Sequence, residues 1–219
     1  MAAGHRERDM KPTRADFLKD VRDHVLRVDY DSGPNRRITL KRPGSGTYAF
    51  TIATFPGTLI YTGDMGTYVF QRSSDMFRFF RTQATTIDPD YWSTKVVAED
   101  KDHGVTEFSD ERFKEVIEER VTEYLASNDD VDEQSLRDAV KDQITDWTYD
   151  SEHHARTEVD AFDHPEAGYI FSDFWESRLT EFTFHFIWAC HAIPWAILKY
   201  DAMTETTTRF DRLITGDRT

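Results

Sequence analysis

Between Thr180 and Asp201 the chain is almost uninterrupted in apolar and aromatic residues. An all-round apolar helix of this length is not tolerated on a wet surface, so the run predicts a helix at the centre of a core. It also contains His185, His191 and Pro194, which disfavour a membrane span of about 20 residues. Pro194 predicts a kink or the start of a new turn. The apolar members of the run are Phe182, Phe184, Phe186, Ile187, Trp188, Ala189, Ala192, Ile193, Trp195, Ala196, Ile197 and Leu198.

Four segments in the first third of the chain alternate between polar and apolar residues, as half-buried strands do. They are residues 37–41, 48–52, 58–62 and 67–71. Short connections that contain glycine separate them, so the segments predict a four-stranded antiparallel meander. A fifth segment, residues 95–98, is a candidate for a short edge strand.

Helical patterns flank the predicted meander. Apolar residues at helical spacing predict a helix over 14–28, with Thr13 as its N-cap. After the last strand, Ser73 or Ser74 is expected to cap a short aromatic helix that covers one face of the sheet. Residues 87–90 contain a proline between two aspartates and are interpreted as a turn.

The second half of the chain is predicted to be mostly helical. Ser109 is expected to cap a helix that ends near Ala126, and Asp130 or Asp132 to cap a second helix. In the second helix an apolar stripe recurs at intervals of three and four residues. A weaker helical pattern covers residues 150–163. The stripe consists of Leu136, Val140, Ile144 and Trp147.

These elements predict an α+β fold: an N-terminal helix, a four-stranded antiparallel meander, and a mostly helical region with a central aromatic helix. One domain is expected over residues 13–201, comprising helix and meander (13–108) and an acidic helical region (109–201). Residues 1–12 are expected to be a mobile tail and residues 202–219 a frayed one.

The formal net charge of -14 is spread unevenly. Residues 1–108 have a net charge of +1, whereas residues 109–219 have a net charge of -15. Non-specific binding to nucleic acid is therefore not expected, because the phosphates would be repelled. A host with a biased composition is one explanation, since Arg outnumbers Lys 19 to 8 and Asp outnumbers Glu 26 to 15. Such a bias should affect both halves alike, so a functional acidic surface is the alternative.

Several common chemistries lack their sequence signatures. The single cysteine, Cys190, excludes an intramolecular disulfide and a zinc site built on several thiolates. It lies in the aromatic run and is expected to be an inert core residue, with His185 and His191 as core or rim histidines. No GxGxxG, Walker A, GxSxG or HExxH pattern is present, and the polar N-terminus does not resemble a secretory signal. No cofactor and no membrane partner are expected.

Carboxylates recur on the predicted acidic helices opposite the apolar stripe. Rows of carboxylates on rigid helices can imitate the phosphates of a duplex and attract a basic groove on a partner protein. The alternative is a soluble acidic surface without a binding role. The candidate residues are Glu111, Glu115, Glu118, Glu119, Asp138, Asp142 and Asp146.

Two weaker candidates are a loop acid and a metal site. Asp64 lies between Gly63 and Gly66, in what is either a plain hairpin turn or a functional loop. His153, His154 and Glu158 belong to a polar cluster that continues to His164. His154 and Glu158 are spaced as an i,i+4 pair that could hold a metal, although a solvated helix face explains the same pattern.

The stretch from Thr54 to Phe70, which reads TFPGTLIYTGDMGTYVF, is followed by DMFRFFR at residues 75–81. Both resemble a family of uncharacterised phage and prophage proteins, as does the segment 184–201. The resemblance implies a phage-encoded accessory protein that acts in the cytoplasm of the bacterial host. It implies no established activity, so no catalytic residue is carried over.

The leading hypothesis is a non-enzymatic accessory protein that binds a basic surface on a host protein, for instance a nucleic-acid-binding defence component. A small enzyme with a site near Gly63–Gly66 and the His153–His164 cluster is the second hypothesis. A self-assembling structural protein is the third. The sequence does not indicate the oligomeric state.

Overall fold

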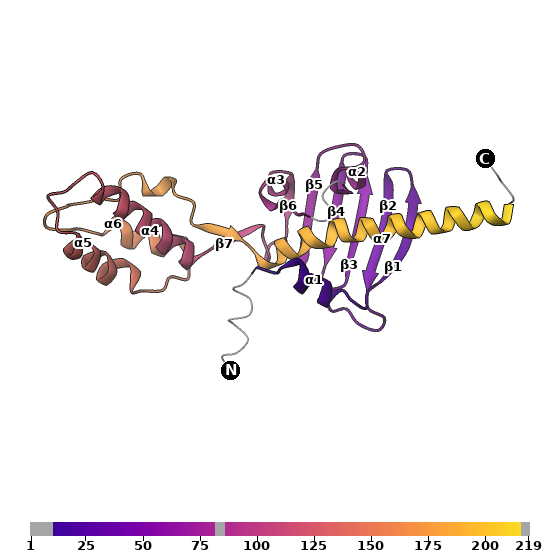
Figure 1. Ribbon diagram of the computed structural model, residues 1–219, viewed down its shortest axis with the longest axis horizontal. Helices are drawn as coiled ribbons and strands as arrows, with labels where there is room; N and C mark the ends of the chain where they lie inside the picture. Colours follow the sequence, from indigo (N-terminus) through magenta and orange to yellow (C-terminus); the bar gives the residue numbers. More distant parts are fainter. Residues whose placement is uncertain (1–10, 82–85, 216–219) are drawn as a thin grey trace. The chain divides into compact units, whose positions relative to one another are not determined.

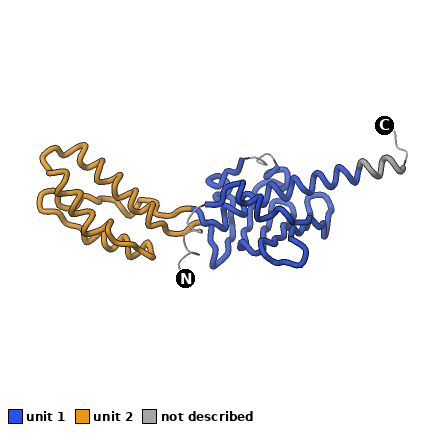
Figure 2. Tube along the Cα trace, turned by 60° about the horizontal axis from the view of Figure 1, so that its bottom comes forward, with its two compact units in different colours: residues 1–105, 182–219 blue, residues 106–181 orange. Residues whose placement is uncertain are grey.

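The computed structural model describes residues 11–81 and 86–215, with side chains up to residue 208. These residues form two compact units (Figure 2). We call the first the sheet unit; it contains the chain up to residue 105 and again from residue 182. The second, the helical unit, is residues 106–181. The single domain expected from the sequence is therefore replaced by a unit inserted within another, and the predicted boundary at residue 108 lies close to the first crossing.

The sheet unit contains six strands that pair antiparallel in chain order (Figure 1). The predicted meander is confirmed and forms the centre of this sheet, with one further strand at each edge. The candidate edge strand at residues 95–98 is confirmed as β6. The strands are β1 (Val25–Ser32), β2 (Asn35–Lys41), β3 (Phe50–Phe55), β4 (Thr58–Gly63), β5 (Gly66–Gln71) and β6 (Val96–Glu99).

The helix predicted over residues 14–28 is shorter than expected. Helix α1 spans Arg14–Asp20 and begins with a capping box between Thr13 and Asp16. The chain then enters β1, where Leu26 and Val28 lie opposite Leu40 and Ile38 of β2. Val25 and Leu26 fitted the helical spacing, but Val25 is 58% exposed, whereas Leu26 and Val28 are partly buried at the spacing of two that is typical of a strand.

Two short helices follow the central strands. Helix α2 (Met76–Arg81) is not capped by Ser73 or Ser74, because the amides of Phe77 and Arg78 donate to Asp75 Oδ1. The turn expected at residues 87–90 is the start of helix α3 (Pro89–Ser93), where Asp88 accepts a hydrogen bond from the Tyr91 amide. Aspartate is a strong N-cap, and proline suits the first helical position.

Helix α7 (Phe184–Thr215) covers the inner face of the sheet (Figure 1). Trp188 is fully buried, and its ring centroid lies 4.9 Å from that of Phe17 and 5.7 Å from that of Phe50. Its indole Nε1 donates to Asp20 Oδ2 at 2.9 Å. The apolar run is thus a core helix, as predicted, although it begins with a short strand, β8 (Thr180–Phe182).

Helix α7 departs from the prediction in three further respects. It passes through Pro194 as one helix and continues to residue 215, so the frayed tail expected after residue 201 is helical as far as described. Phe184 and Trp195 are only partly buried, whereas Ile187 is buried with Trp188. The expected tail at residues 1–12 lies mostly outside the described residues.

The helical unit has a core of its own. Its apolar cluster includes Phe113, Ile117, Leu136 and Phe171, all fully buried. The predicted caps are confirmed at Ser109 and Asp132, which accept from the amides of Arg112 and Ser135. The elements are β7 (Thr106–Phe108), α4 (Asp110–Leu125), α5 (Glu133–Val140), the π-helix η1 (Lys141–Thr145), α6 (Glu152–Asp160) and the 3₁₀-helix η2 (Phe174–Glu176), closed by β8, which pairs with β7.

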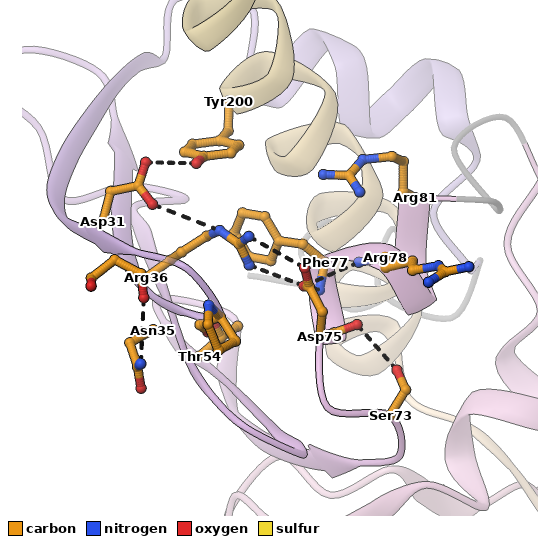
Figure 3. Close-up of polar contacts among 12 residues, drawn as sticks. Asp31, Asn35, Arg36, Thr54, Ser73, Asp75, Phe77, Arg78, Arg81 and Tyr200 are labelled. Atoms are coloured by element: carbon orange, nitrogen blue, oxygen red, sulfur yellow. Dashed lines mark hydrogen bonds and ion pairs between the residues drawn. The ribbon is translucent and has the colours of Figure 1, made fainter.

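A polar cluster fastens α7 to the sheet and to α2 (Figure 3). The guanidinium of Arg36 donates to both carboxylate oxygens of Asp75, at 3.0 and 3.3 Å, and lies 4.8 Å above the ring of Phe77. The Tyr200 hydroxyl donates to Asp31 Oδ2 at 2.6 Å, and Asp31 also lies 3.8 Å from Arg36 Nε. Because the planar guanidinium of Arg36 donates to both oxygens of one carboxylate, this contact holds Asp75 in one orientation relative to β2.

Replacing Trp188 by alanine should lower the free energy of unfolding by about 3–5 kcal/mol, because it leaves a large cavity between α1, α7 and the sheet. Urea denaturation followed by circular dichroism measures the change. Trp175→Ala is the matched control, because this tryptophan is 71% exposed and its loss should cost under about 0.5 kcal/mol. Equal effects of the two substitutions would contradict the assigned packing.

Stability should also fall in acid through Asp75. Burial alone would raise the pKa of this carboxyl, but hydrogen bonds and charge from Arg36 outweigh it and hold the pKa below its ordinary value of 3.8. A pKa depressed by folding contributes stability above the unfolded-state value, and this contribution is lost as pH falls through the folded value.

Denaturation midpoints measured between pH 6 and pH 2 should therefore depend less on pH in Asp75→Asn than in the unmodified protein. Asp102→Asn, an exposed loop substitution, serves as the control and should keep the original pH dependence. Identical profiles for the unmodified protein and Asp75→Asn would show that the Arg36 contact contributes nothing.

Candidate functional site

The acidity of the protein belongs to the helical unit. Residues 106–181 hold 23 Asp and Glu against 7 Lys and Arg, a net charge of -16. The rest of the chain holds 18 acidic and 20 basic residues, a net charge of +2. The change in charge coincides with the boundary between two separately packed cores. A bias in the composition of the host would affect both units, so it does not explain this distribution.

The carboxylates expected to form an unpaired row on α4 are largely neutralised. Arg112 Nη1 lies 3.0 Å from Glu115 Oε2 and 3.1 Å from Glu119 Oε1. Glu118 pairs with Arg137 of α5, which also contacts Glu133 at 2.8 Å. These hydrogen bonds raise the pKa of both guanidinium groups. The sequence pattern placed the acids on one helix correctly but did not reveal the arginines that reach them.

Three further candidate aspartates lie on α5, on η1 and directly after η1. Asp138, Asp142 and Asp146 follow one another at intervals of four along α5 and η1, and all are exposed. In the described part of the chain, none of them forms an ion pair with Lys or Arg. Asp138 Oδ1 accepts only a neutral hydrogen bond, from Gln134 Nε2 at 2.9 Å. We call these three residues the aspartate stripe.

An exposed tryptophan lies directly beside the stripe. The sequence pattern placed Trp147 in the apolar stripe of the second helix, but its side chain is 62% exposed. The cause is η1, where the Asp146 amide donates to the Lys141 carbonyl and the wider turn shifts the register after Ile144. Tyr149 is buried instead, with its hydroxyl donating to the Ile144 carbonyl at 2.9 Å. The Trp147 indole Nε1 donates to the Asp142 carbonyl at 3.2 Å, which fixes the ring next to the stripe.

The histidine cluster does not assemble a metal site among the described residues. His154 Nε2 lies 3.6 Å from Glu158 Oε1, and no group of three or more metal-ligating side chains occurs in residues 11–81 and 86–215. His153 is exposed beside them. His164 is buried, and its Nδ1 accepts from the amides of Glu166 and Ala167 at 3.3 and 3.1 Å. His164 thus stabilises the loop after α6.

Asp64 stabilises the loop in which it lies. Its carboxylate accepts from the Tyr48 amide at 2.7 Å, and its own amide donates to the Ala49 carbonyl at 2.9 Å. Tyr48 has a φ of 57°, a left-handed conformation that costs energy for a bulky residue and that these hydrogen bonds offset. In the hairpin itself, Gly66 has a φ of 84°, as the turn requires.

Cys190 and the two histidines of the aromatic run lie where the sequence predicted, the cysteine in the core and the histidines partly buried at its rim. Cys190 is fully buried, and burial raises the pKa of its thiol well above the ordinary value. His191 packs against Phe17, and its pKa is lowered mainly by burial. His185 stacks on His103 with 3.8 Å between ring centroids. A thiol that stays protonated is a poor nucleophile, so Cys190 is a core residue.

Comparisons with known proteins identify no relative. No protein-family model matches the chain, and no curated protein or solved structure is significantly similar to it. In the described part of the chain, no helix has both the length and the apolarity that a membrane crossing requires. The resemblance to phage and prophage proteins therefore stays a prediction.

The two groups of carboxylates should respond differently to charge reversal. Replacing Glu115, Glu118 and Glu119 by lysine places cations beside Arg112 and Arg137, so stability should fall by about 1–3 kcal/mol. The same reversal at Asp138, Asp142 and Asp146 breaks no ion pair and should cost less. Thermal unfolding of the two triple variants, which carry the same net charge, measures the difference; equal midpoints would argue against the ion pairs on α4.

Proposed function

We propose that the protein is a non-enzymatic binding protein whose helical unit docks on a basic surface of a partner protein. The observation that carries this proposal is the aspartate stripe: three exposed carboxylates, with no cationic partner among the residues that the structure describes, beside an exposed tryptophan. Tryptophan is among the residues most enriched at the energetic centre of protein interfaces, and charges around it steer the encounter.

The partner that suits the stripe is a protein, and the spacing of the charges limits how closely the stripe imitates DNA. Four residues of α-helix rise about 6 Å. One strand of a duplex carries a phosphate every 3.4 Å or so along the axis. On regular α-helix geometry the stripe would be about half as dense in charge as one strand, and the wider turn of η1 makes the spacing between Asp142 and Asp146 differ from that between Asp138 and Asp142. Electrostatic attraction of a basic protein is therefore the broader expectation. Imitation of a duplex, a host defence target and a phage origin are narrower predictions within this proposal.

Partner capture with matched variants tests the proposal. The protein is immobilised and exposed to a bacterial host lysate at low salt, and the captured protein is identified, purified and titrated against each variant. Asp138→Asn/Asp142→Asn/Asp146→Asn should weaken binding by about tenfold or more. Asp150→Asn/Asp163→Asn/Asp173→Asn changes the net charge equally at other exposed positions and should have little effect. Affinity should fall as salt shortens the Debye length below about 8 Å.

Trp147→Ala provides a test that does not depend on charge. It should increase the dissociation rate of the captured partner, whereas Trp175→Ala, the other strongly exposed tryptophan of this unit, should leave it unchanged. Competition by a DNA duplex for the same partner distinguishes imitation of DNA from binding elsewhere. If the stripe triple, the control triple and the unmodified protein bind alike at every salt concentration, the acidic surface is not the binding surface.

A further inference from the structure

The sheet unit contains an open groove of about 560 Å³ at one end of the sheet. Its lining residues come from three segments: the turn and first residue of β4 (56–58), the end of β5 (Gln71 and Arg72) and the residues before β6 (Thr94 and Lys95). The Gln71 amide donates to the Lys95 carbonyl at 2.9 Å, and the Arg72 amide donates to the Gly57 carbonyl at 3.1 Å. Backbone hydrogen bonds thus fix segments that are distant in the sequence, and the groove that they form is polar and open to solvent.

Two cations line the groove without a carboxylate among the lining residues. Arg72 and Lys95 contribute the charges. Within the described ranges Arg72 has no ion pair, in contrast to Arg36 and Arg81, each of which lies within 3.0 Å of an aspartate oxygen. The Lys95 ammonium lies 4.6 Å above the ring of Tyr91. In a chain with a net charge of -14, two cations in a groove whose lining residues include no carboxylate favour an anion as its ligand.

The remaining polar groups suit the oxygens of a phosphate. Thr58 and Thr94 also line the groove, although Thr58 is buried and the Thr94 hydroxyl donates to the Tyr91 carbonyl at 2.7 Å. The Gln71 amide Nε2 lies 3.5 Å from Thr58 Oγ1. A guanidinium fork can donate two parallel hydrogen bonds to one phosphate, and an ammonium adds a compact charge. A doubly charged group gains from both cations at once, which favours a phosphate monoester over a single carboxylate.

An apolar platform adjoins the groove on the same face of the sheet. Phe55 lies opposite Thr58, and Thr58 lies opposite Gln71, so the three side chains share one face. Phe55 is 46% exposed, and Ile60 and Val69 continue this face as a half-buried pair one step further along the strands. Aromatic side chains stack on nucleobases without strong preference among them.

We propose that this groove binds a nucleotide, with its phosphate held by Arg72 and Lys95 and its base against Phe55. The site lies in the sheet unit and does not depend on the proposed role of the helical unit. The two can therefore fail separately: the groove is tested with small ligands and the aspartate stripe with a partner protein.

Titration calorimetry and two-dimensional NMR of the full chain test this proposal with adenosine 5′-monophosphate, inorganic phosphate and adenosine. Saturable binding of the nucleotide is expected, tighter than that of phosphate or adenosine alone. Arg72→Gln and Lys95→Gln should each weaken nucleotide binding about tenfold, which is the effect of losing one charge-assisted hydrogen bond. Phe55→Ser should weaken nucleotide binding but leave phosphate binding unchanged.

Arg42→Gln is the matched control, because Arg42 is an exposed arginine in the loop after β2 and does not line the groove. It should bind the nucleotide as the unmodified protein does, and thermal unfolding should show that all variants are folded. The proposal is overturned if no saturable binding occurs up to about 10 mM nucleotide, or if Arg72→Gln and Arg42→Gln bind equally.

Discussion

The packing of α7 on the inner face of the sheet is the interaction on which the other parts of this fold depend. An antiparallel sheet with one apolar face must bury that face, and α7 supplies the cover through Phe186, Trp188, Ile193 and Ile197, all buried. Helix α7 follows the helical unit in the sequence. The sheet unit therefore needs residues from both sides of the inserted segment 106–181 to complete its core. The insert must then return the chain close to where it left. Thr183 secures this return, since its amide donates to the Val105 carbonyl at 3.1 Å and its hydroxyl to the Gly104 carbonyl at 2.7 Å.

The parts of the fold that local chemistry decides could be predicted from the sequence. The central strands are set by alternation and by glycine turns, and the caps at Ser109 and Asp132 by side chains that satisfy free amides. Elements that depend on distant partners could not be predicted in this way. Val25 and Leu26 extended the helical spacing of the residues before them, so the start of β1 was assigned to a helix, and its pairing with β2 is a contact with a separate segment. Trp147 is exposed because a π-turn interrupts an otherwise regular stripe. The division into two units was not visible, because no linker-like composition marks either crossing.

The candidate sites show the same limit. The acids of α4 and α5 lie on helices, as their spacing predicted, but the sequence could not show which of them meet arginines. Arg137 reaches from α5 to Glu118 of α4, a contact between residues nineteen positions apart that no helical periodicity encodes. The groove at Arg72 was missed because its residues come from three separate segments and match no motif. The signal that could have indicated it is the absence of acids around Arg72 between residues 65 and 74.

The uneven distribution of charge between the two units also limits the energetic cost of repulsion among the acidic side chains. Like charges destabilise a compact state by mutual repulsion, and the helical unit bears nearly all of that repulsion because the sheet unit is close to neutral. Within the helical unit, Arg112, Arg120, Arg137 and Arg156 each pair with at least one glutamate, so the repulsion is concentrated at described positions whose carboxylates form no ion pair with Lys or Arg. The aspartate stripe is such a place. In the described chain its aspartates form no ion pair with Lys or Arg, and the exposed Trp147 lies beside them. This combination supports the proposed binding role, in which the charges would raise the association rate and the ring would slow dissociation.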